Sequence, residues 1–170
     1  MASPSLVPGT TPDVTFNSSS VLSFDAGFGP TVGAWLSSGG AFNVTENTAG
    51  TLASLISDGS NVGTVIDFKG TMRVTSGQTF TITHDDGIYL SINGIDMGFN
   101  PNPTPPETET ETWGGASGCY PYELVYTENH GGYATLVGDL GSVPDGGTTV
   151  ALLGMGFAGL AVLRNKFARN

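Results

Sequence analysis

The segment Gly70–Met97 reads GTMRVTSGQTFTITHDDGIYLSINGIDM and has the clearest strand pattern of the chain. Apolar residues alternate with polar ones from Thr79 to Thr83 and again from Ile88 to Ile92. This period of two is typical of a strand that buries one face in a core. Residues that favour turns separate the stretches, namely Ser76-Gly77, Asp85-Asp86-Gly87 and Asn93-Gly94. The segment therefore predicts a β-meander.

Shorter apolar runs lie on both sides of this segment and predict further strands. The upstream runs are 21–24, 41–44, 51–56 and 62–68, divided by turn signals at Gly39-Gly40, Asp58-Gly59 and Lys69-Gly70. Downstream, Thr108–Trp113 alternates but is polar on both faces, which favours either an edge strand protected by charge or a loop. Two more strands are predicted at Tyr120–Tyr126 and Tyr133–Leu140. We expect an all-β, antiparallel β-sandwich at 14–141, formed by non-adjacent segments and preceded by a flexible leader at 1–13.

The composition supports an all-β fold and argues against nucleic-acid binding. The 170 residues include 26 glycines, and only 12% are charged, which suits short strands and many turns. The five cations are Lys69, Arg73, Arg164, Lys166 and Arg169, so the chain before Thr148 has two cations against fifteen acids and a net charge of −13. Such an acidic body repels phosphates, so we expect no nucleic-acid partner.

The last 29 residues, 142–170, contain three consecutive features. Residues 148–163 read TTVALLGMGFAGLAVL, without a charge, and as a helix they would be about 24 Å long, against about 30 Å for a hydrocarbon core. The absence of a polar face favours a transmembrane helix over a buried core helix. The residues before it are Val143, Pro144, Asp145, Gly146 and Gly147, and the basic end at 164–170 supplies Arg164, Lys166 and Arg169 as a membrane stop. These cations predict a cytoplasmic C-terminus with the body on the other side of the membrane.

In this order of motif, apolar helix and basic end, the tail resembles the PEP-CTERM family of sorting signals, in the variant that opens with Val-Pro-Asp. The resemblance implies recognition of Pro144, Asp145 and Gly146 by an exosortase, a membrane-embedded processing enzyme, with cleavage near the motif. It also implies a bacterial cell-envelope or extracellular location and a link to exopolysaccharide and biofilm. Because the first residues have neither a basic region nor an apolar one, the export signal is expected outside the given sequence.

A second resemblance covers the body. The stretches FKGTMRVTSGQTFTITHDDGIYLSING, at 68–94, and GCYPYELVYTENHGGYATLVGDL, at 118–140, are similar to the lectin-like β-sandwich of the anthrax protective antigen and the yeast flocculins. In sugar-binding members, two consecutive aspartates, joined by a cis bond, hold Ca²⁺ and contact glycan hydroxyls. Asp85 and Asp86 match those positions, which implies a calcium-dependent lectin site.

The chemistry of the loops is compatible with that implication. Ca²⁺ takes several hard oxygen ligands, and Glu128 and Asn129 in a later loop are candidates for joining Asp85 and Asp86. The alternative is that Asp85-Asp86-Gly87 serves only as a turn. A metal or acid–base pair formed by His84 and His130 is a further hypothesis.

The chain has no motif of a known catalytic centre, so we expect no enzyme. The sequence favours an exported cell-surface or extracellular-matrix protein that associates with exopolysaccharide, with Ca²⁺ as its cofactor. Three alternatives stay open at this point. They are a structural matrix protein without a ligand site, a hydrolase accessory or enzyme, and a permanently anchored membrane protein.

Overall fold

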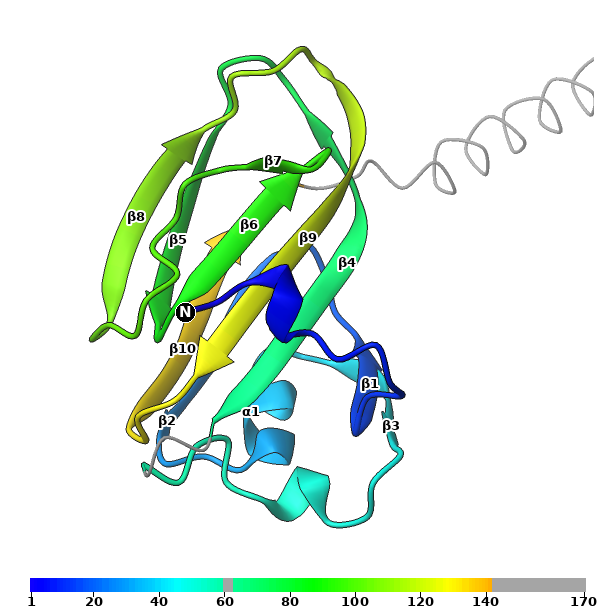
Figure 1. The fold of residues 1–170 in the computed structure, drawn as a ribbon, viewed down its shortest axis with the longest axis vertical. Helices are drawn as coiled ribbons and strands as arrows, with labels where there is room; N and C mark the ends of the chain where they lie inside the picture. The colour runs from blue at the N-terminus through cyan, green and yellow to red at the C-terminus, as the bar shows by residue number, and fades with distance from the viewer. Residues whose placement is uncertain (60–62, 142–170) are drawn as a thin grey trace, which may run out of the picture.

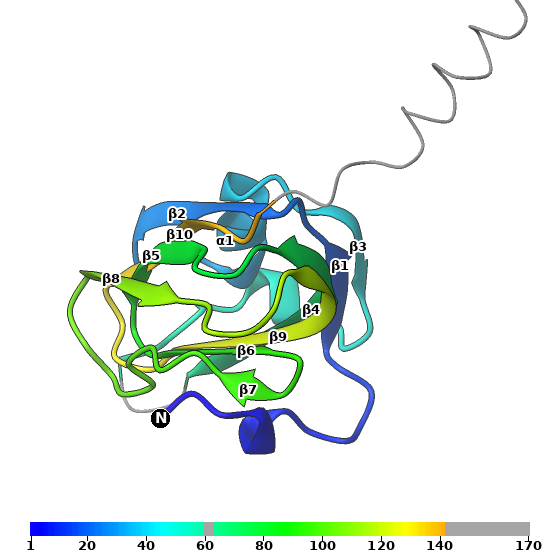
Figure 2. The same cartoon turned by 90° about the horizontal axis from the view of Figure 1, so that it is seen from above.

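Two four-stranded antiparallel sheets face each other in residues 1–59 and 63–141, the part of the chain that the computed structural model describes (Figure 1, Figure 2). The first sheet has the order β2-β10-β5-β8, with β2 (Val21–Phe28), β10 (Tyr133–Asp139), β5 (Thr79–Asp85) and β8 (Glu107–Thr112). The second has the order β4-β9-β6-β7, with β4 (Thr64–Val74), β9 (Gly118–Glu128), β6 (Ile88–Ile92) and β7 (Ile95–Asp96). The inner faces of the two sheets form the core.

Smaller elements lie around the sandwich (Figure 1). They are the ribbon of β1 (Val14–Asn17) and β3 (Phe42–Glu46), the helix α1 (Val32–Ser38), and the 3₁₀ turns η1 (Pro4–Leu6) and η2 (Thr51–Ala53). The helix begins where the Thr31 hydroxyl accepts a hydrogen bond of 3.2 Å from the Ala34 N–H, an N-terminal cap that the sequence pattern alone did not reveal.

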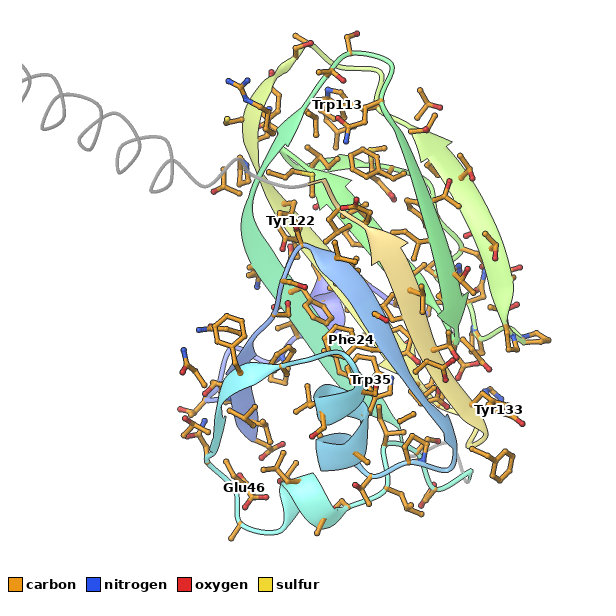
Figure 3. The ribbon with its side chains drawn as sticks, turned by 180° about the vertical axis from the view of Figure 1, so that it is seen from behind. Phe24, Trp35, Glu46, Trp113, Tyr122 and Tyr133 are labelled. Carbon is orange, nitrogen blue, oxygen red and sulfur yellow. The ribbon has the colours of Figure 1, made fainter. Side chains whose placement is uncertain are left out.

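A stack of three aromatic rings joins the helix to both sheets. Trp35 on α1 lies between Phe24 of β2, at a centroid distance of 4.4 Å, and Tyr126 of β9, at 5.4 Å. Figure 3 shows the rings of Phe24 and Trp35 side by side. The Trp35 indole N–H also donates a bond of 2.9 Å to the Ala134 carbonyl on β10. All three rings are fully buried, so the stack ties four elements to one another.

Several expectations from the sequence are confirmed. The fold is mostly β with antiparallel sheets, and each sheet combines segments that are distant in the sequence. Thr108–Trp113 belongs largely to β8, which is an edge strand. Asn93 and Gly94 connect β6 to β7 with φ values of 53° and 75°, which a two-residue hairpin turn of this type requires.

The predicted β-meander is wrong. β4 and β6 belong to one sheet, whereas β5, the strand between them in sequence, pairs with β10 and β8 in the other. The turns after Val74 and after Asp85 therefore pass from one sheet to the other. Alternation reports only that one face of each strand is buried, and both sheets bury their faces in the same core, so the pattern could not assign β5 to a sheet.

Two local predictions are also corrected. Lys69-Gly70 is not a turn but lies inside β4, where Gly70 pairs with Tyr122. A Cβ atom at Gly70 would lie 2.8 Å from the Tyr122 ring, so any larger residue would have to displace that ring. Residues 51–56 do not form a strand either, because Thr51–Ala53 is a 3₁₀ turn.

The expected leader makes contacts with the body. Ala2 is buried and its N–H donates a bond of 2.5 Å to the Pro101 carbonyl, and Pro4–Leu6 forms η1. The sorting motif at Val143–Gly147, the predicted transmembrane helix at 148–163 and the basic residues Arg164, Lys166 and Arg169 all lie outside the described residues. Within the described ranges, no helix has the length and apolar character needed to span a membrane.

The aromatic stack generates a stability prediction. Replacing Trp35 with Ala removes a fully buried ring, and we expect the free energy of unfolding to fall by about 3–5 kcal/mol. Phe28 is a matched aromatic control because it is 76% exposed, and Phe28→Ala should change stability by no more than about 0.5 kcal/mol. Urea denaturation followed by fluorescence or circular dichroism measures both; equal effects of the two variants would contradict the stack's role.

Candidate functional site

The Asp85–Asp86 turn lies at the end of β5, at one end of the sandwich. The peptide bond between the two aspartates is cis, as the lectin-like resemblance implied. Asp86 is buried, with 2% of its surface exposed, whereas Asp85 is partly exposed. The two neighbouring carboxylates therefore have different environments, one held inside the protein and one closer to solvent.

Two backbone N–H groups from separate loops fix the Asp86 carboxylate. Its Oδ1 accepts a bond of 3.2 Å from the Thr104 N–H, in the loop before β8, and its Oδ2 accepts one of 2.7 Å from the Asn129 N–H, after β9. His130 Nδ1 lies 3.6 Å from the same Oδ2. Charge-assisted hydrogen bonds of this kind hold a carboxylate in a fixed orientation. The turn between the two sheets is thus joined to both neighbouring loops.

Tyr126 connects Asp85 to Glu128. The Tyr126 hydroxyl donates to the Asp85 carbonyl and lies 3.3 Å from Glu128 Oε2. Glu128, at the end of β9, is 2% exposed. One carboxylate oxygen from each of Asp85, Asp86 and Glu128 lies within 4.8 Å of the others. We call these three residues the acidic site.

Two carboxylates of the acidic site, those of Asp85 and Glu128, have raised pKa values. Burial, followed by the charge of Asp86, raises the pKa of Asp85 from 3.8 to about 6. Burial, followed by the charges of Asp86 and Asp85, raises the pKa of Glu128 from 4.5 to about 7, although hydrogen bonds from Tyr126 and the His130 backbone oppose the shift. Among the ion pairs of residues 1–59 and 63–141, none joins a Lys or Arg to these carboxylates. Close like charges without a cation favour protonation or a bound metal ion.

The structure brings three of the four predicted ligands together. Asp85, Asp86 and Glu128 form the acidic site, while Asn129 reaches Asp86 through its backbone N–H. The two histidines make no contact with each other among the described residues, but both approach Asp86: His84 Nδ1 lies 2.6 Å from its carbonyl oxygen, and His130 faces its carboxylate.

Sequence reasoning missed Thr104 and Tyr126. Thr104 lies in the Pro/Asn-rich loop before β8 and contributes only its backbone N–H to the site, so the type of its side chain did not indicate a role there. Tyr126 lies in a predicted strand, where an aromatic residue is usually part of the core. Its ring is indeed buried in the core, and only the hydroxyl reaches the site.

The donor set fits a hard divalent cation. Ca²⁺ accepts carboxylate and carbonyl oxygens in flexible geometries with six to eight ligands, and three carboxylates from two loops converge here. Among the described residues, no hydrogen bond ends on the Asp85 carboxylate, so its oxygens are free to act as ligands. A cation would also relieve the repulsion that raises the pKa values of Asp85 and Glu128.

Comparisons with known proteins bear on both parts of the chain. Residues 142–167 match the family model described as the VPDSG-CTERM motif. The structure is similar to the PA14 domain of the antifreeze protein MpAFP, with a TM-score of 0.54 and 18% identity over 83% of this chain and 82% of that one. It is also similar to a PA14 sugar-binding domain from an RTX adhesin, with a TM-score of 0.50 and 20% identity over 78% of this chain and 72% of that one.

No curated protein matches the chain. The comparisons establish a VPDSG-CTERM tail and a body with the PA14 fold, as the two resemblances in the sequence had indicated.

The raised pKa values predict how the stability of the metal-free protein depends on pH. Because Asp85 and Glu128 bind protons more tightly in the folded than in the unfolded chain, they stabilise the fold most below about pH 4, and this contribution is lost as the pH rises through 6 to 7. Thermal midpoints from pH 5 to 8 in the presence of a chelator should therefore decrease more steeply for the wild type than for Glu128→Gln. Asp13→Asn is the control and should behave as the wild type does, since Asp13 is an exposed acid outside the site. If the thermal midpoint of Glu128→Gln decreased with pH as steeply as that of the wild type, the raised pKa of Glu128 would be contradicted.

Proposed function

We propose that this chain is an exported protein of the bacterial cell surface or extracellular matrix, sorted by its C-terminal tail, whose body binds a polysaccharide through Ca²⁺ at the acidic site. The VPDSG-CTERM match at 142–167 supports export and sorting, with an exosortase-type enzyme as the processing partner. The PA14 fold of the body supports the binding role, because one similar structure is described as a sugar-binding domain.

The observation that carries the calcium proposal is the convergence of three carboxylates with no Lys or Arg partner in residues 1–59 and 63–141. Asp86 is fixed by backbone donors from two loops, and Glu128 by Tyr126 and the His130 backbone. Such a site is organised before the ion arrives, so binding does not have to order the ligands. Asp85 is the partly exposed member, so solvent can reach the ion from its side.

A glycan would complete the coordination of the ion. Three protein carboxylates leave several of the six to eight positions of Ca²⁺ open, and neighbouring hydroxyl groups of a sugar are neutral oxygen ligands that can replace water there. Phe28 and Tyr133, which are 76% and 55% exposed and in edge contact at 5.7 Å, lie where β2 ends and β10 begins, beside the 128–132 loop. They offer apolar faces next to the proposed ligand.

Two other functions differ from this one in the role of the acidic site. A structural matrix protein would use the same tail and fold without any ligand, and the Asp85–Asp86 turn would then serve the fold alone. A permanently anchored membrane protein would keep its C-terminal helix. In each case we propose a binding or structural role rather than catalysis.

Calcium binding tests the proposal directly. Titration calorimetry on the full chain, in mild detergent and after chelator treatment, should detect one Ca²⁺ per chain. Asp85→Asn and Glu128→Gln should each weaken binding at least tenfold, because each removes one charge from the ligand set. Asp13→Asn makes the same change of charge outside the site and should leave affinity unaltered. Wild-type protein that takes up no Ca²⁺ would favour the structural alternative.

Glycan binding is tested separately from calcium binding. On an array of bacterial polysaccharides, the full chain should bind in Ca²⁺ and lose the signal in a chelator. The Asp85→Asn variant should lose the signal as well, while Asp13→Asn should retain it. Calcium uptake without a Ca²⁺-dependent array signal would leave a structural ion and contradict the lectin role.

Processing of the tail can be followed by mass spectrometry of protein secreted by an exosortase-containing host. We expect the mature product to end near the 143–147 motif and to lack Arg164, Lys166 and Arg169. Replacing Pro144 and Asp145 with Ala should prevent cleavage, because these residues belong to the matched motif. Secreted protein that retains its last residues would contradict sorting by cleavage and favour the permanently anchored form.

A further inference from the structure

A second group of possible metal ligands lies between β5 and β8 and shares no side chain with the acidic site. His84 on β5 pairs in register with Glu107 on β8, and Glu109 lies two residues further along the same strand. His84 Nε2 is 3.1 Å from Glu109 Oε2 and 4.0 Å from Glu107 Oε1. One ligand atom from each of the three residues lies within 4.8 Å of the others.

The hydrogen bond on the other side of the His84 ring fixes its tautomer. His84 Nδ1 lies 2.6 Å from the Asp86 carbonyl oxygen, which can only accept, so Nδ1 carries a hydrogen. A neutral ring then turns the lone pair of Nε2 toward Glu109. An ionised carboxylate oxygen also only accepts, so a proton or a metal ion must lie between the two atoms, which are 3.1 Å apart. His84 itself is fully buried.

Asn100 holds both glutamates in place around the histidine. Its backbone N–H donates a bond of 2.7 Å to Glu109 Oε2, and its side-chain amide donates one of 2.7 Å to Glu107 Oε1. Bonds of this kind to ligating carboxylates, and from the second nitrogen of a ligating histidine to a carbonyl, are the usual outer contacts of metal sites. The glutamate side chains are 35% and 28% exposed, so an ion can enter from solvent.

We propose that His84, Glu107 and Glu109 bind a transition-metal ion of the Zn²⁺ class. With Zn–N and Zn–O distances of about 2.0–2.2 Å, two tetrahedral ligand atoms lie about 3.4 Å apart, close to the 3.1 Å between His84 Nε2 and Glu109 Oε2. A proton on Nε2 would reach Glu109 at 3.1 Å but not Glu107 at 4.0 Å, whereas a metal ion would bind all three residues. An imidazole nitrogen selects Zn²⁺ over Ca²⁺, which takes oxygen ligands. This site does not depend on the proposed lectin function.

The test uses the full chain in mild detergent, freed of metal by a chelator and titrated with ZnCl₂ by calorimetry. We expect one Zn²⁺ per chain and a loss of affinity of at least tenfold in the Glu107→Gln/Glu109→Gln double variant, whose partly exposed positions should preserve the fold in circular dichroism. Glu111→Gln is the matched control, because Glu111 follows in the same partly buried row of β8, and it should bind Zn²⁺ as the wild type does. Asp85→Asn should also retain Zn²⁺ binding.

Three results would overturn the proposal. The first is wild-type protein that takes up no Zn²⁺, which would leave His84 held by a proton in an internal ion pair with Glu109. The second is Zn²⁺ binding that is unchanged in the double variant. The third is binding that persists in the double variant but is lost in His130→Gln or Asp85→Asn, which would place the metal at the acidic site instead.

Discussion

Tyr126 joins the hydrophobic core to the acidic site through a single side chain. Its ring stacks on Trp35 in the core, while its hydroxyl donates to the Asp85 carbonyl and contacts Glu128. Burial, together with the nearby carboxylates, raises the pKa of Tyr126 well above its ordinary value, so the hydroxyl keeps its hydrogen and remains a donor. The position of the turn therefore depends on the packing of the sandwich, and the same stack that stabilises the fold orients the site.

The end of β5 concentrates negative charge, and no Lys or Arg of the described residues pairs with it. In the described ranges, Lys69 pairs with Asp67 and Glu123 at distances of 2.7 and 3.1 Å, away from both candidate metal sites. The carboxylates of Asp86, Glu107 and Glu109 instead contact backbone N–H groups, the Asn100 amide and the two histidines. Asp86 contributes to both candidate metal sites, since its carboxylate belongs to the acidic site and its backbone carbonyl oxygen contacts His84 Nδ1.

The tail and the body divide the proposed function between them. In the proposed function, the tail, which matches the VPDSG-CTERM motif, is the sorting signal. The body, with the PA14 fold, provides the surface that would contact a matrix. An acidic body suits this arrangement because it remains soluble outside the cell and attracts divalent cations, which are abundant there relative to the cytosol. Sorting would not require the acidic site, and ligand binding would not require the tail, so the sequence patterns of the two parts can lie in separate segments.

The sequence by itself determined most of the strand segments, the Asn93-Gly94 hairpin, the Asp85–Asp86 turn and the sorting motif of the tail, because each depends on a local pattern of residues. It did not place β5 in the sheet opposite β4 and β6, and it did not pair Tyr126 with Asp85 or His84 with Glu107 and Glu109. A period of two shows which face of a strand is buried but not which strand lies beside it. Only the packing of the two sheets around one core brings residues from β5, β8 and β9 to the same end of the molecule.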